Sequence, residues 1–199
     1  MKQEINQLLQ KEADAILNIP KTNNFEAVID LIYKSVHENN GKLIASGMGK
    51  AGQIAINIAT TLSSTGTPAV FIHPSDAQHG DLGLIQKNDI LLLISNSGKT
   101  REIVEFFYLA RNLYSNLPVI VITGNPVSEL GELADVTIST GNPAEVCPLG
   151  MAPTTSTTVM TVIGDILVVQ LMHKINFSKE SYAKLHHGGY LGTKARGIQ

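Results

Sequence analysis

Short, continuous runs of apolar residues recur along the middle of the chain. They lie at 42–46, 69–73, 89–95, 118–123 and 135–139, and they are rich in isoleucine and valine. Runs of this length without polar alternation are typical of strands that are covered on both faces. Helical spacing of apolar residues occurs between most of them, at about 50–63, 100–113 and 127–133. This alternation predicts a five-stranded parallel sheet in a three-layer α/β/α sandwich.

The two ends of the chain follow other patterns. Residues 4–17 and 24–38 have apolar side chains at helical spacing, and 153–174 predict one long closing helix. Thr154, Thr155 and Ser156 are candidates to cap that helix. The tail at 176–199 is polar and rich in glycine. We therefore expect one domain over 1–199, with N-terminal helices (1–40), an α/β core (41–175) and a C-terminal tail (176–199).

Composition narrows the class of protein. Hydrophobic residues make up 43% of the chain and charged residues 16%, as in ordinary globular proteins. A net charge of −2 gives no reason to expect a nucleic-acid partner. Charges interrupt the first 20 residues, unlike a signal peptide, and no apolar stretch approaches the ~20 residues that span a bilayer. We expect a cytoplasmic protein without a membrane partner.

Cysteine and histidine give no metal site. The single cysteine, Cys147, excludes an intramolecular disulfide and a cysteine-based zinc site, and it is expected to be a small buried residue. His73, His79, His173 and His186 are far apart in the sequence and lack the paired spacing of a zinc motif. We expect no bound metal.

The sequence SNSGKT at 95–100 follows a predicted strand and precedes a predicted helix. A nucleotide-triphosphate loop would need a second glycine five positions before Gly98, and Leu93 stands there. The loop is therefore too short to wrap a di- or triphosphate. The hydroxyls of Ser95, Ser97 and Thr100, with free N–H groups at a helix start, suit one phosphate monoester.

A second glycine motif, SGMGKAG, follows the first strand. Gly47, Gly49 and Gly52 fit the dinucleotide pattern G-x-G-x-x-G, which alone is a weak signal, and Asp76 is a marginal ribose-binding acid. A turn without a ligand is a further alternative. We favour a loop that approaches a small phosphorylated ligand, because Lys50 lies at the carboxyl end of a strand.

Five segments together resemble the sugar isomerase (SIS) domain family over about residues 25–196. They are SGMGKAG, FIHPSDAQHGDLG (71–83), SNSGKT, VCPLGMAPTTSTT (146–158) and LHHGGYLGTKA (185–195). The last two resemble its D-arabinose 5-phosphate isomerase branch. The resemblance implies a flavodoxin-like fold and the interconversion of ribulose 5-phosphate and arabinose 5-phosphate through an enediolate, for Kdo and lipopolysaccharide synthesis or for capsule synthesis. It also implies a homotetramer with sites between subunits, and a reaction that needs neither cofactor nor metal.

The resemblance also assigns roles to four residues. Glu145 matches the base that moves the carbon proton, and its apolar neighbours Val146 and Leu149 are expected to raise its pKa. Glu102 matches a glutamate in the first turn of a helix, where the dipole favours the anion, so we interpret it as an orienting or proton-relay residue. Lys50 holds the enediolate oxygen or the phosphate. His186 serves ring opening or proton transfer from the tail, in a neighbouring subunit's site.

The other implied residues bind the substrate. His79 and Asp81 match a loop that lines the pocket, although a structural turn is nearly as good an interpretation. The expected substrate- and phosphate-binding residues are Ser46, Gly49, Ser95, Asn96, Ser97, Gly98 and Thr100.

Three departures from the branch matter, and the last two leave the sugar open. Many members continue into a pair of CBS domains, whose regulation we do not expect here because the sequence ends soon after Gly-Thr-Lys-Ala. Members often have glutamate where Lys99 stands, and His187 replaces a proline. Some SIS domains act as regulatory modules, so one alternative is a non-catalytic phosphosugar sensor, which would need the phosphate loop but no base. Another is an isomerase of a different sugar phosphate, such as a hexulose 6-phosphate.

Overall fold

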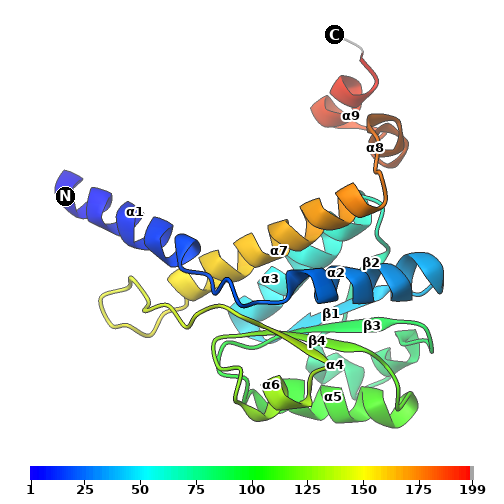
Figure 1. The fold of residues 1–199 in the computed structure, drawn as a ribbon, viewed down its shortest axis with the longest axis horizontal. Coiled ribbons are helices and arrows are strands. Elements are labelled where there is room, and N and C mark those ends of the chain that lie inside the picture. The colour runs from blue at the N-terminus through cyan, green and yellow to red at the C-terminus, as the bar shows by residue number, and fades with distance from the viewer. Residues whose placement is uncertain (198–199) are drawn as a thin grey trace.

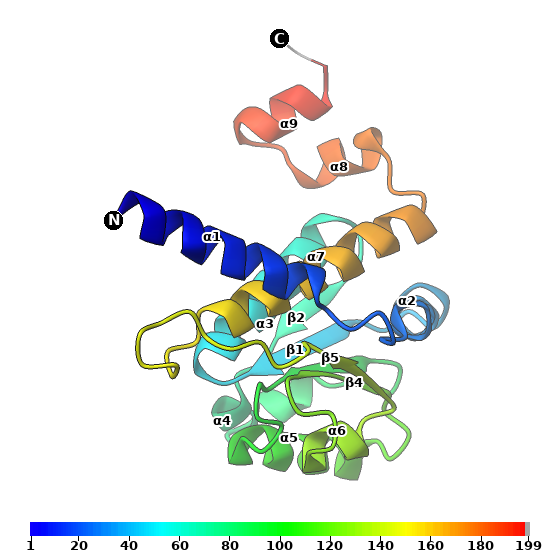
Figure 2. The same cartoon turned by 60° about the vertical axis from the view of Figure 1, so that its left-hand side comes forward.

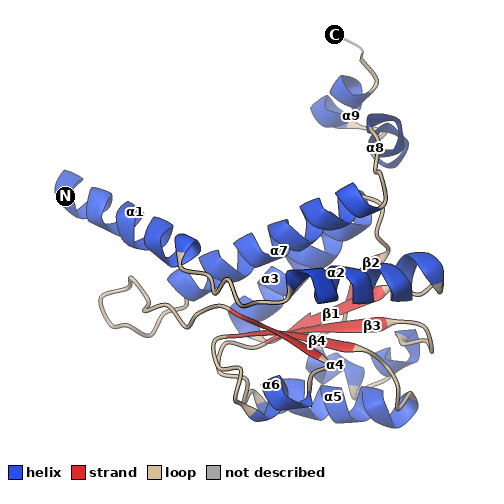
Figure 3. Ribbon diagram, viewed as in Figure 1, coloured by secondary structure: helices blue, strands red, loops and turns tan. Residues whose placement is uncertain are grey.

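A five-stranded sheet forms the centre of the computed structural model, which describes residues 1–197 (Figure 3). All its strands are parallel, in the order β2-β1-β3-β4-β5. The strands are β1 (Leu43–Gly47), β2 (Ala69–Phe71), β3 (Ile90–Ile94), β4 (Val119–Thr123) and β5 (Val136–Ser139). The prediction of a five-stranded parallel sheet is confirmed, and this strand order is that of flavodoxin-like folds.

The continuous apolar runs are explained by the two cores that the sheet separates. In β3, Ile90, Leu92 and Ile94 pack in one core, whereas Leu91 and Leu93 pack in the other. All five side chains are fully buried. A strand with helices on both faces has no exposed side, so no polar alternation is needed.

Helices cover both faces of the sheet, as Figure 1 shows. One face carries α2 (Phe25–Tyr33), α3 (Gly49–Ser64) and α7 (Thr155–Lys174), and the π-helical turn η1 (Lys34–Glu38) continues α2. The other face carries α4 (Pro74–Ala77), α5 (Arg101–Leu113) and α6 (Glu129–Leu133), with a 3₁₀ turn η2 (Asp81–Leu84) after α4. The predicted three-layer sandwich is therefore confirmed.

Helix α7 corrects one expectation from the sequence. Among residues 1–197 it is the one helix that is long and apolar enough to cross a membrane, so the expectation that no stretch reaches this length was wrong. Half of the most apolar stretch of α7 is buried inside the protein, and Val159, Ile163 and Leu167 pack in the core. A helix that is apolar on most sides is typical of the interior of a domain.

Three helices extend from the three-layer body, as Figure 2 shows. They are α1 (Lys2–Leu17) at the N-terminus and α8 (Lys179–Leu185) and α9 (Gly189–Ala195) near the C-terminus. Neither α1 nor α8 has a buried residue. The chain thus exposes apolar side chains on α1, including Leu9 at 64%, and on the C-terminal segment, including Tyr190 at 76%.

Candidate active site

A cavity of about 620 Å³ lies at the carboxyl ends of the strands. From β1 the chain passes to α3 on one face of the sheet, whereas from β3 it passes to α5 on the other face. Adjacent strands whose connections diverge in this way leave a crevice, and open parallel sheets bind ligands there. The lining residues are Met48, Lys50, Ala51, Ile94, Ser95, Asn96, Ser97, Lys99, Thr100, Gly124, Asn125, Asn142, Glu145, Met151, Pro153, Ser156, Thr157 and Met160.

The SNSGKT segment curls into a compact turn before α5. Ser95 Oγ accepts a hydrogen bond from the Gly98 N–H at 3.2 Å and lies 2.9 Å from Thr100 Oγ1. The backbone of Gly98 has a φ of +64°, and Gly98 is buried under the turn. Ser95, Asn96, Ser97 and Thr100 therefore line the cavity together, beside the N-terminus of a 13-residue helix. Such a cluster of hydroxyls and N–H groups suits one phosphoryl group.

The first glycine motif shapes the turn that carries Lys50. A Cβ on Gly52 would lie 2.6 Å from Gly47 O, so glycine is needed where β1 packs against the start of α3. Gly49 has a φ of +57°, which favours glycine, and the buried Ser46 donates to Ile72 O at 2.7 Å. Ser46 and Gly49 do not themselves line the cavity.

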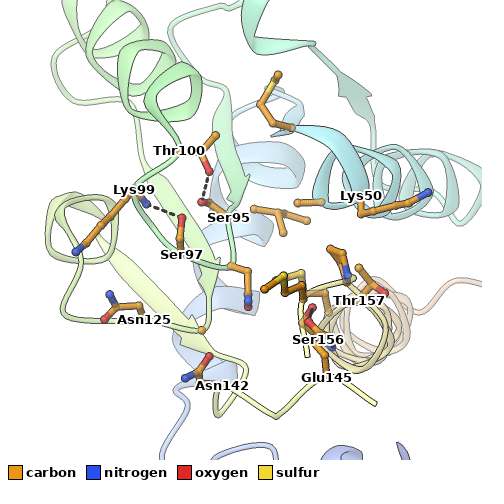
Figure 4. Close-up of a pocket in the computed structure, with 18 residues that line it drawn as sticks. Lys50, Ser95, Ser97, Lys99, Thr100, Asn125, Asn142, Glu145, Ser156 and Thr157 are labelled. Atoms are coloured by element: carbon orange, nitrogen blue, oxygen red, sulfur yellow. Dashed lines mark hydrogen bonds between the residues drawn. The ribbon is translucent and has the colours of Figure 1, made fainter. Parts of the chain in front are cut away.

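Lys50 lines the cavity at its edge. Its ammonium group lies 3.5 Å from Gln53 Oε1, and Figure 4 shows the side chain extending away from Ser95. A lysine side chain has enough rotatable bonds to turn toward a bound anion. Lys99, one of the departures from the family pattern, lines the same cavity, so two cations border it.

Glu145 is held against the first turn of α7 by four hydrogen bonds. Its Oε2 accepts from the Thr154 N–H at 2.7 Å, from Thr154 Oγ1 at 2.9 Å and from the Ser156 N–H at 3.3 Å. Its Oε1 accepts from the Ser156 hydroxyl. Thr154, Thr155 and Ser156 were predicted to cap α7, but none of their side chains does so. The Glu145 carboxylate instead accepts the free N–H groups at the start of this helix.

This arrangement contradicts the expectation of a raised pKa. Burial raises the pKa of Glu145, but the hydrogen bonds from Ser156 and Thr154 together outweigh burial, and the net pKa is lowered. The expected apolar surroundings are incomplete, since Leu149 is 77% exposed. A helix N-terminus also favours the anion. Glu145 is therefore ionised at neutral pH.

Cys147 holds together the loop that follows Glu145. The sequence predicted a buried cysteine, whereas this side chain is only half-buried. Cys147 Sγ accepts hydrogen bonds from the N–H groups of Met151 at 3.2 Å and Ala152 at 3.1 Å. The thiol closes a loop at the surface instead of filling a core. Met151, brought back by that turn, lines the cavity.

Several predicted site residues lie outside the cavity. Glu102 is in the first turn of α5, and His79 and Asp81 are in the segment from α4 to η2. His186 follows α8, stacks on the Tyr182 ring at a centroid distance of 3.7 Å and places Nδ1 2.9 Å from Tyr182 O. None of these residues lines the cavity within one subunit.

Two residues that line the cavity, Asn125 and Asn142, were not predicted from the sequence. They follow β4 and β5 just as the phosphate loop follows β3, so the rule that ligands bind at the carboxyl ends of strands would have included them. Figure 4 shows them on one side of the cavity, with Glu145, Ser156 and Thr157 on the other. Within residues 1–197, no group of three histidine, cysteine, aspartate or glutamate side chains could hold a metal ion.

Comparison with known proteins places this geometry in a family. The SIS domain model matches residues 35–170. Arabinose 5-phosphate isomerase KdsD of Yersinia pestis is 42% identical over 190 residues, which cover 94% of this chain and 56% of that protein. The chain spans about half the length of the curated relatives that it matches.

Two solved structures are similar along nearly their whole length. A proposed phosphosugar isomerase involved in capsule formation, from Bacteroides fragilis NCTC 9343, is 66% identical, with a TM-score of 0.94 and coverage of 96% of this chain and 99% of that one. A protein of Escherichia coli CFT073 in complex with arabinose 5-phosphate is 32% identical, with a TM-score of 0.82 and coverage of 94% and 96%.

Proposed function

The chain belongs to the SIS domain family, and on that premise we propose that it interconverts D-ribulose 5-phosphate and D-arabinose 5-phosphate through an enediolate. The observation that carries the proposal is that a single cavity joins the phosphate loop of Ser95 and Thr100 to the carboxylate of Glu145. The name of the Yersinia pestis relative and the ligand of the Escherichia coli complex support this sugar phosphate over a hexulose phosphate.

Each part of the cavity has a task in the proposed reaction. The hydroxyls and N–H groups around Ser95 and Thr100 hold the phosphate, so that the carbon chain extends toward α7. Glu145 removes a proton from C1 of the ketose and returns it to C2, and a second proton moves between the two oxygens. Lys50 swings inward to stabilise the negative oxygen of the enediolate.

The hydrogen bonds of Glu145 affect this mechanism in two ways. The lowered pKa keeps the carboxylate ionised at neutral pH, as a base must be, but it also makes the carboxylate a weaker base. We infer that one oxygen leaves the Ser156 hydroxyl when substrate binds and turns toward C1. The remaining bonds to Thr154 hold the side chain beside the substrate.

A neighbouring subunit completes the site in this proposal. His186 lies outside the cavity of its own chain, on a segment that extends from the body (Figure 2). The exposed apolar side chains of α1 and of the C-terminal segment support assembly, which we propose is a homotetramer. His186 then enters a partner's cavity for ring opening or proton transfer, and Glu102 orients groups at its edge.

The proposed product is consumed in the cytoplasm. Arabinose 5-phosphate would feed the synthesis of Kdo for lipopolysaccharide or capsule, and the capsule role of the Bacteroides fragilis protein supports this direction. A phosphorylated sugar is charged and does not cross a membrane unaided, so an enzyme of its metabolism acts where the sugar is made.

Incubation of the purified protein with ribulose 5-phosphate in heavy water tests the proposal. We expect arabinose 5-phosphate with deuterium at C2, because the base exchanges its proton with solvent during the enediolate step. Bound ligand without exchange or aldose would instead indicate a phosphosugar sensor. Exchange with a hexulose 6-phosphate but not with the pentulose would reassign the substrate.

A further inference from the structure

Three asparagine side chains border the cavity, Asn96 from within the phosphate loop and Asn125 and Asn142 from outside it. Asn96 follows β3, Asn125 follows β4 and Asn142 follows β5, and all three line the cavity. They therefore come from three neighbouring strands, at the edge of the sheet where ligands bind. Their amide groups carry no charge, unlike Lys50 and Glu145 at other parts of the wall.

Two of these amides lie close to Gly124. A Cβ on Gly124 would lie 2.8 Å from Asn96 Oδ1 and 3.1 Å from Asn142 Oδ1. The backbone of Gly124 is not in the left-handed region, so its conformation does not require glycine. A side chain at this position would push the Asn96 amide aside and crowd the Asn142 amide and the backbone oxygen of Asn96.

The backbone of each asparagine is held, while its amide is left free. Asn96 O accepts from the Gly124 N–H at 3.0 Å, the Asn125 N–H donates to Thr123 Oγ1 at 3.1 Å, and the Asn142 N–H donates to Thr140 Oγ1 at 3.3 Å. No side-chain amide of the three makes a hydrogen bond to another residue between 1 and 197. The fold thus fixes the backbone of each asparagine and leaves its amide available to a ligand.

The chemistry of an amide indicates what it binds. Each asparagine side chain offers two N–H donors and one oxygen acceptor. A phosphate or carboxylate at neutral pH chiefly accepts, so it would leave the amide oxygens unpaired. A hydroxyl group both donates and accepts, and a row of hydroxyls on a carbon chain can pair with all three amides.

We propose that Asn96, Asn125 and Asn142 form a hydroxyl-binding subsite that recognises the secondary hydroxyls of a polyhydroxylated, phosphorylated carbon chain. This inference rests on the proposed function for the identity of the ligand and deepens it. The phosphate loop holds one end, Glu145 meets the reacting end, and the asparagines distinguish a sugar from a deoxygenated chain of the same length.

Calorimetric titration with two ligands that cannot isomerise tests the subsite. D-arabinitol 5-phosphate carries the hydroxyls and n-pentyl phosphate lacks them. We expect Asn142→Ala, Asn125→Ala and Asn96→Ala each to weaken arabinitol phosphate binding by about 3- to 10-fold, the effect of one hydrogen bond. Binding of pentyl phosphate should stay within about twofold, because it makes no such bond.

Asn112→Ala is the matched control, since Asn112 is exposed on α5 and does not line the cavity. It should change neither affinity. Equal losses for both ligands, or no loss in any of the three cavity variants, would overturn the subsite. Neither ligand can turn over, so the result is independent of the isomerase assay: asparagine-dependent binding without isomerisation would reject the proposed function alone.

Discussion

The Thr155 side chain donates a hydrogen bond of 2.8 Å to Glu12 Oε1, joining residues 143 positions apart. The same hydroxyl oxygen accepts from the Val146 N–H at 3.1 Å. One buried hydroxyl therefore connects α1, the start of α7 and the residue next to Glu145. The second oxygen of Glu12 is buried and has no partner among residues 1–197.

Removal of this connection should loosen α1. We expect Glu12→Ala to lower the free energy of unfolding by about 1 kcal/mol, the net effect of one such hydrogen bond, and Thr155→Val to lower it by more, because it also removes the acceptor of the Val146 N–H. The double variant should lose less than the sum, because both changes remove the same bond. Urea unfolding measures all three, with exposed Glu38→Ala as control; additive losses would contradict the coupling.

Glu145→Gln should reduce turnover by at least about a hundredfold, since an amide cannot take the carbon proton. Binding of arabinitol 5-phosphate should survive, because the phosphate loop is unchanged. Coupled-enzyme assay and calorimetry separate the two effects. Glu132→Gln, an exposed change on α6, is the control. Near-normal turnover in Glu145→Gln would remove Glu145 as the base.

The lowered pKa of Glu145 predicts a pH-dependent contribution to stability. A depressed carboxylate pKa stabilises the fold above the ordinary value, here 4.5, and this contribution is lost as the pH falls through the folded pKa. Wild type should therefore exceed Glu145→Gln in unfolding free energy at about pH 7, and the gap should narrow toward about pH 3. A gap that widens in acid would show the opposite sign.

Gly98→Ala should damage both stability and phosphate binding. Its φ of +64° strains a side chain, and a Cβ would lie 1.8 Å from Ser128 Oγ, which accepts the Gly131 N–H at the start of α6. We expect a loss of roughly 1–3 kcal/mol in unfolding free energy and weaker binding of inorganic phosphate. Gly83→Ala, where a Cβ meets nothing within 4 Å, should leave both unchanged. Comparable losses in the two variants would refute the steric argument.

Subunit mixing tests whether His186 acts between chains. Glu145→Gln and His186→Ala should each turn over slowly when alone. If a site takes Glu145 from one subunit and His186 from another, random co-assembly restores about a quarter of the sites. Activity of the reassembled mixture measures this fraction. A mixture no more active than its components would place both residues in the same chain's site.

The sheet could be predicted from sequence because its signal is redundant. In β3, for example, each residue from Ile90 to Ile94 faces a core, so the run is apolar whichever face is considered. The missed helices are short: α4 has 4 residues, and α8 and α9 have 7 each. Helices of one or two turns give too few positions for periodic spacing to be recognised.

Site residues that belong to a sequence motif could be predicted. Properties that depend on how the chain packs could not. SNSGKT indicated hydroxyls that do line the cavity. The direction of the Glu145 pKa could not be predicted, because its decisive partners Thr154 and Ser156 lie 9 and 11 residues further along the chain and meet it only through the path of the intervening loop. Asn125 and Asn142 belong to no sequence motif, and because their side chains are uncharged, no pattern of charge along the sequence indicated them either.

The contacts between Glu145 and the start of α7 give one side chain two opposing tasks. In the proposed mechanism, the carboxylate that releases the Ser156 hydroxyl for chemistry also anchors the longest helix of the core. Selection for heat resistance should therefore strengthen this anchor and slow the enzyme, whereas selection for speed should weaken it and lower the melting temperature.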